Sequence, residues 1–215
     1  MSLRLLPFRQ YDENDVINMF ALDSTLALES TTGDGEGSAG VFVKVTAGDL
    51  DNDTITYGTN SYLGKTDYPF VGPNMYPTNP LTLSGAASGE LPLGITLNQT
   101  AKADENGEKL LYNAQKKEEL QAVLPGQTVP VATKGIFTLA ATAFDGGINA
   151  HLADADDGYA IGSGVKISQE TPGKITGCHA TLAESFGTII ATGNRASQGG
   201  LTDQFVGEFM VIKIG

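Results

Sequence analysis

The chain has 215 residues, a net charge of −12 and a single cysteine. A chain this acidic repels phosphate backbones, so we expect no direct binding of nucleic acid, and one cysteine permits no internal disulfide. No apolar run approaches the ~20 residues that cross a bilayer, and residues 1–7 are too short and broken for a secretion signal. The sequence therefore predicts synthesis in a cytoplasm and no membrane partner.

Glycine is the most informative part of the composition. The chain holds 27 glycines, which predict short strands joined by tight turns because glycine readily adopts the positive φ that such turns need. Combined with the alternating segments below, they predict an all-β fold, a barrel or sandwich built of hairpins with glycine turns. We expect residues 1–30 to be an N-terminal arm or first strand. Residues 31–215 are expected to form a single barrel-like body with long loops at 58–90 and 140–162.

The first ten residues differ in charge from the rest of the chain. They contain Arg4 and Arg9 and no acid, within a chain that is strongly acidic overall. We expect an anchoring arm over 1–22 whose two arginines pair with acids on a neighbouring molecule; an ordinary first strand is the alternative. The apolar run 16–22 fits a strand or a short helix equally well. Other candidate partner contacts in this arm are Leu6, Phe8 and Tyr11.

The body begins with a segment of period two. Val41, Val43 and Val45 share one face and Lys44 and Thr46 the other, which predicts a strand. Short apolar or alternating runs predict further strands at 54–57, 91–97, 109–112, 119–124, 128–131, 134–139, 164–168, 173–176, 187–192 and 209–214. In two places, one of these runs is followed by a turn that contains glycine and then by the next run. We therefore expect two hairpins, 128–131 with 134–139 and 164–168 with 173–176.

Residues 58–80 combine tyrosine and phenylalanine with four prolines. Proline at this density excludes a helix and a central strand. An ordered loop of this length normally packs against something, so it either covers the core or contacts a neighbour. The candidate contact residues in this aromatic loop are Tyr62, Tyr68, Phe70 and Tyr76.

No pattern of chemistry-bearing residues predicts an enzyme. The acidic turn 49–53 begins like a calcium loop, but the sixth position, where an EF-hand needs glycine, holds Thr54. We predict a solvated turn there, with irregular calcium binding as the alternative. Cys178 and His179 are neighbours on an expected strand and so point to opposite faces. The remaining histidine cluster is predicted to be an acidic surface loop and comprises His151, Asp154, Asp156 and Asp157. The sequence thus predicts no catalytic, metal or cofactor site.

The order of the glycine-punctuated strands carries a resemblance. Residues 40–45, 92–96, 126–135, 164–177 and 187–193, closed by 209–214, resemble the capsid cement, or head-decoration, proteins of tailed bacteriophages. Residues 5–18 also resemble the start of virion structural proteins from phages of marine bacteria.

The resemblance implies a body bound at symmetry positions on the outside of the virion shell. Its partners would be the major capsid protein and copies of itself, and its role would be to hold capsomers together against the pressure of the packaged DNA. It implies no catalytic residues and no cofactor. A tail or neck component of the virion and a glycan-binding β module are the alternatives.

Overall fold

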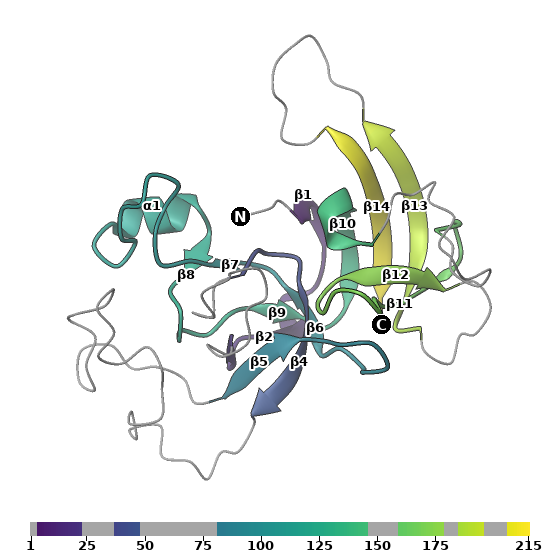
Figure 1. Cartoon of the computed structure of the whole chain (residues 1–215), viewed down its shortest axis with the longest axis horizontal. Helices are drawn as coiled ribbons and strands as arrows, with labels where there is room; N and C mark the ends of the chain where they lie inside the picture. The colour runs from purple at the N-terminus through teal and green to yellow at the C-terminus, as the bar shows by residue number, and fades with distance from the viewer. Residues whose placement is uncertain (1–3, 23–36, 48–80, 146–158, 179–184, 196–205) are drawn as a thin grey trace.

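The computed structural model describes residues 4–22, 37–47, 81–145, 159–178, 185–195 and 206–215. Within these ranges strand is the main regular secondary structure, and two six-stranded sheets share one hydrophobic core (Figure 1). The all-β prediction is confirmed, in its sandwich form: neither sheet closes into a barrel within the described part of the chain.

Sheet A has the strand order β1-β10-β14-β13-β11-β12, and every neighbouring pair in it is antiparallel. Its two longest strands, β13 and β14, are adjacent and form a ribbon that rises beyond the other strands of the sheet in Figure 1. The bounds are β1 Leu5–Gln10, β10 Gly135–Ala140, β11 Gly164–Ile167, β12 Ile175–Cys178, β13 Gly187–Arg195 and β14 Gly207–Ile214.

Sheet B has the order β2-β9-β6-β4-β5-β3 and is antiparallel apart from the β3–β5 pair. An isolated bridge joins Ala21 of β3 to Thr128, just before β9, so the sheet curls and brings one edge back towards its other half. The bounds are β2 Val16–Ile17, β3 Ala21–Leu22, β4 Phe42–Ala47, β5 Thr82–Gly85, β6 Gly94–Thr96 and β9 Val131–Ala132.

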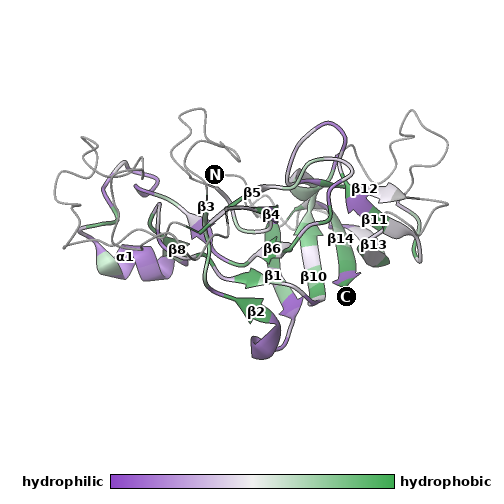
Figure 2. Ribbon diagram, turned by 90° about the horizontal axis from the view of Figure 1, so that it is seen from below, coloured by the Kyte–Doolittle hydropathy of each residue, from purple (hydrophilic) through white to green (hydrophobic). Residues whose placement is uncertain are grey.

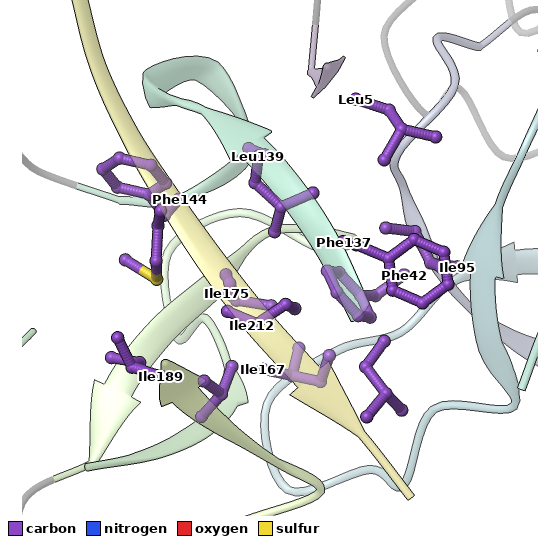
Figure 3. Close-up of a cluster of buried hydrophobic side chains, with 14 of the residues drawn as sticks. Leu5, Phe42, Ile95, Phe137, Leu139, Phe144, Ile167, Ile175, Ile189 and Ile212 are labelled. Carbon is purple, nitrogen blue, oxygen red and sulfur yellow. The ribbon is translucent and has the colours of Figure 1, made fainter. Parts of the chain in front are cut away.

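The core between the sheets is built from the inward side chains of both. Phe42 and Ile95 come from sheet B and lie against Phe137 of sheet A, with Ile212 of the neighbouring strand close by (Figure 3). All four are fully buried. Burial of each such side chain stabilises the fold by roughly 1.5–3 kcal/mol, so this cluster fixes the two sheets against each other.

Strand β4 is buried on both of its faces. Phe42 faces the core between the sheets, whereas Val41 and Val43 belong to a second cluster inside the curl of sheet B. The far end of the strand departs from the expected amphipathic pattern, because Val45 is 43% exposed whereas Lys44 is half-buried.

Residues 97–124 form a small annex with its own apolar cluster. Its two ends are joined by the parallel pairing of β7 (Gln99–Thr100) with β8 (Ala122–Val123). Helix α1 (Ala114–Glu119) lies at the outer side of the annex (Figure 1). The Asn113 side chain caps α1 by accepting a hydrogen bond from the amide of Lys116 at 3.2 Å. The helix buries no residue and is mainly hydrophilic in Figure 2. The strands predicted at 109–112 and 119–124 are therefore wrong, except for β8.

One of the two expected hairpins forms. β11 and β12 pair directly, as predicted. β9 and β10 do not, because they enter different sheets across a corner at Gly135. Gly135 has φ +141°, and a Cβ there would lie 2.7 Å from the carbonyl oxygen of Gln10, so β1 occupies the space that a hairpin partner would need.

Other expectations fall partly outside the described residues. The run 16–22 contains the two short strands β2 and β3, preceded by the 3-10 turn Glu13–Asp15, so its strand alternative holds. Residues 82–85, which the sequence placed inside a loop, form β5. The 140–162 segment begins with the 3-10 turn Ala141–Ala143. The strand expected at 54–57 and the rest of the 58–80 loop lie outside the described ranges.

Candidate attachment surface

Strand β1 forms one edge of sheet A and is interrupted in its middle. Leu5 pairs with Leu139 and Arg9 with Phe137, so four residue steps along β1 face only two along β10. Pro7 lies inside this irregular stretch and has no amide hydrogen to give to a ladder. The chain therefore bulges from the sheet at this point, and Phe8 is left 76% exposed.

The two arginines of this segment turn into the molecule. Arg4 is only 4% exposed, and its carbonyl oxygen accepts a hydrogen bond from the amide of Ala140 at 2.8 Å. The Arg9 guanidinium donates to the carbonyl oxygen of Leu97 at 3.3 Å and to Gln121 Oε1 at 3.4 Å, which ties β1 to the annex. Arg4 therefore does not belong to the candidate surface. Pairing of Arg9 with an acid on a neighbour stays a prediction.

Apolar side chains remain along the outside of this edge. Tyr11, 36% exposed, stacks on Phe137 with ring centroids 6.0 Å apart and an angle of 17° between the rings. One face of the tyrosine ring is thus held by the core. Leu6 is half-buried, and Phe8 stands out from the bulge between them. We name Leu6, Phe8 and Tyr11 the N-terminal apolar edge.

Several residues singled out by the sequence lie outside the described part of the chain. They include the acidic turn 49–53, the histidine cluster that begins at His151, and His179. The four aromatic residues of the loop also lie outside it: Tyr62, Tyr68, Phe70 and Tyr76. Cys178 is the last residue of β12. Contact of the aromatic loop with a partner stays a prediction.

The ribbon of β13 and β14 is a feature that the sequence analysis missed. β11 accompanies β13 only through Gly187 and Thr188, and the last backbone bonds on that side join Ile189 to Gly162 and Ser163. Beyond that point, Ala191–Arg195 pairs with β14 alone among the described residues. Within the described part of the chain the ribbon thus carries an open backbone edge, which the register reveals and the residue pattern does not.

A glycine and an aromatic ring face each other on the ribbon. Gly193 is the cross-strand partner of Phe209. A Cβ placed on Gly193 would lie 2.6 Å from the Cζ atom of Phe209, so the ring rests directly over the glycine backbone. Such covering of a strand glycine by an opposite aromatic side chain fixes register and stiffens an exposed strand pair.

The ionisable side chains form local pairs. A hydrogen bond from Lys44 lowers the pKa of Glu90. A bond of 2.9 Å between Lys116 and Glu105 raises the pKa of the lysine and lowers that of the glutamate. Within the described ranges, no three His, Cys, Asp or Glu side chains lie close enough to hold a metal ion.

One buried carboxyl stands apart from these pairs. Asp145 is 9% exposed, and burial raises its pKa although Lys174 lies 3.7 Å away. Its carbonyl oxygen accepts a hydrogen bond from the Tyr159 hydroxyl, and its amide donates to Ile175. These contacts attach the chain that follows β10 to strand β12, which is a structural role.

A small hollow opens between the β5–β6 connection and β11. Its volume is about 170 Å³, and it is lined by Ser88, Gly89, Glu90, Leu91, Lys166, Ile167 and Ser185. The Ser185 hydroxyl already accepts from the amide of Val165 and donates to the carbonyl oxygen of Gly187. It is therefore committed to holding the backbone and is not presented as a nucleophile.

Comparison of the chain with protein-family models, with curated protein sequences and with solved structures gives no match in any of the three. Among the described residues, no helix has the length and apolar character needed to cross a membrane.

Proposed function

We propose that the chain is a virion structural protein: a capsid decoration protein that binds the outside of the major capsid protein shell of a tailed phage and stabilises the head. The supporting observation is the N-terminal apolar edge, where Phe8 is held out from a rigid sandwich by a proline-containing bulge. The resemblance of the glycine-punctuated strands to cement proteins names the class of partner.

The N-terminal apolar edge can attach the chain to a partner without any catalytic step. Pro7 and the bulge make β1 a poor template for further strand pairing, so this edge resists uncontrolled aggregation of the chain with itself. An exposed aromatic ring on a rigid edge can still fill a pocket in a partner, and its burial would contribute roughly 1.5–3 kcal/mol. Many copies on one shell convert contacts of this size into lasting attachment.

The test is to locate and count the chain on particles of the phage that encodes it. Electron microscopy is expected to show density for the sandwich on the outer surface of the head, at hundreds of copies. A position in the tail or neck at tens of copies overturns the proposal in favour of the first alternative. Absence from particles combined with binding on a glycan array would favour the second.

A pair of matched variants tests the surface itself. Phe8→Ser is expected to weaken binding to undecorated shells by about 10- to 100-fold, the equivalent of losing one buried aromatic ring. Leu91→Ser is the control, because Leu91 is 80% exposed on the β5–β6 connection, away from β1. Equal binding by the two variants would remove the N-terminal apolar edge from the interface.

A further inference from the structure

Among the residues that the structure describes, no strand pairs with the outer edge of the β13–β14 ribbon over the distal half of β13. Ile189 directs its amide and carbonyl groups away from β14, because both bond to the chain at Gly162 and Ser163. Ile189 faces Ile212, so this pair is not hydrogen-bonded across the ribbon, and Ala191 next pairs with Val211 after the bulge. Alternation along an antiparallel ladder then turns the backbone groups of every second residue outward.

That alternation identifies the outward residues. Since Ile212 bonds towards β10, Val211 and Phe209 bond towards β13, and their partners Ala191 and Gly193 face inward into the ribbon. Thr192 and Asn194 therefore direct their amide and carbonyl groups to the open side. Among the described residues, no backbone hydrogen bond reaches that side beyond Ile189.

From this geometry we propose that β13 pairs antiparallel with β13 of a second copy of the chain, about a two-fold axis at Gly193. In this register Thr192 of each copy faces Asn194 of the other, and the outward groups of all four residues exchange hydrogen bonds. The two ribbons become one four-stranded sheet in the order β14–β13–β13–β14. The pairing is self-complementary, as a two-fold interface requires, and it does not depend on the capsid role.

The Phe209 ring favours a second copy over an unrelated strand. In the two-fold register the two Gly193 residues oppose each other as a non-hydrogen-bonded pair, with Cα atoms ~4.5 Å apart. Each Phe209 ring already lies over its own Gly193. The rings of the two copies would therefore meet above the two glycines, in the distance range where aromatic pairs attract.

Charge favours the same contact. The chain has a net charge of −12, so two copies repel each other over most of their surface. Strand β13 contains no acid, and its one charged residue is Arg195 at the tip. The edge also lacks the proline and lysine residues with which natural edge strands commonly prevent pairing.

The first measurement uses the unmodified chain. Sedimentation velocity over a range of concentrations up to several hundred micromolar is expected to show reversible dimers, since a contact of this small size is weak. Hydrogen exchange at low and high concentration is expected to slow the amides of Thr192 and Asn194 on dimerisation. The amide of Gly193, already bonded within the ribbon, should change little. A chain that stays monomeric, or a dimer that leaves these two amides unprotected, overturns the proposal.

Variants at one position separate backbone pairing from side-chain effects. Thr192→Pro removes an outward amide hydrogen and places the ring Cδ atom in its position, so it is expected to weaken the dimer at least tenfold. Thr192→Val keeps that amide and is expected to dimerise like the original chain. Phe209→Ala, which removes the facing rings, is expected to weaken the dimer by about tenfold at most. Equal dimerisation of the proline and valine variants would refute the pairing, and Asn194→Pro repeats the test if Thr192→Pro does not fold.

Discussion

Phe42 is the side chain whose removal most directly tests the description of the sandwich. It comes from the middle of sheet B, is fully buried in the core between the sheets, and packs against Phe186 with ring centroids 5.2 Å apart. Its amide donates to the carbonyl oxygen of Gly173, and its own carbonyl accepts from Ala86. These backbone bonds do not depend on the side chain, so a substitution here removes packing alone.

Phe42→Ala is expected to lower the free energy of unfolding by about 3–5 kcal/mol, the usual cost of truncating a buried phenylalanine. Phe42→Leu, which keeps most of the volume, is expected to cost less than ~1.5 kcal/mol. Urea unfolding followed by circular dichroism or tyrosine fluorescence measures both, since the chain has seven tyrosines and no tryptophan. The slope of free energy against urea should be unchanged.

The matched control is Phe8→Ala, the same substitution at a position that is 76% exposed. It is expected to change the free energy of unfolding by less than ~0.5 kcal/mol. A loss below about 1 kcal/mol for Phe42→Ala, or an equal loss for the two alanine variants, would show that Phe42 does not join the sheets.

Two further predictions concern single positions. Gly94→Ala is expected to lower the melting temperature and to cost roughly 1–3 kcal/mol, because its Cβ would lie 2.2 Å from the carbonyl oxygen of Ala132 in the β6–β9 pair; an unchanged melting curve would contradict that close approach. Asp145→Asn is expected to raise stability at neutral pH, because burial raises the pKa of Asp145 in the folded state. A raised pKa means that the folded chain binds the proton more tightly, so the original chain loses stability as the pH rises from the ordinary aspartate range through the folded-state pKa. The advantage of the asparagine variant should therefore shrink as the pH falls through that window, and a constant difference at all pH values would refute the assignment.

The sequence predicted strands most accurately where apolar and polar residues alternate along the strand. The runs at 134–139, 164–168 and 209–214 lie in strands β10, β11 and β14, whose inward residues recur at every second position. The run 109–112 misled because Leu110 packs into the local cluster of the annex, which gives an apolar turn the same composition as a strand. Composition reports burial and does not distinguish a strand from a buried turn.

Pairing over long distances could not be derived from the residues. β10 lies between β1 and β14, more than a hundred residues before it and about seventy after it, and no local signal names these partners. The candidate surface shows the same limit. Phe8, a candidate contact residue from the sequence, is exposed in the structure, and its contact with a partner stays a prediction. The inward turn of Arg4 depends on neighbours that the sequence does not reveal.

The position of β14 within sheet A has a consequence for biosynthesis. This strand supplies Met210, Ile212 and Ile214 to the core and separates β10 from β13, so sheet A cannot close until the ribosome has released residues 207–214, long after β10 has emerged. Until then, Phe137 and Leu139 remain exposed on the nascent chain, because β10 is an edge strand as long as its neighbour β14 is missing. Closure of sheet A must therefore follow the synthesis of β14, at a rate set by contacts distant in sequence. A nascent chain stalled before residue 207 should bind chaperones and should acquire protease resistance only once synthesis resumes.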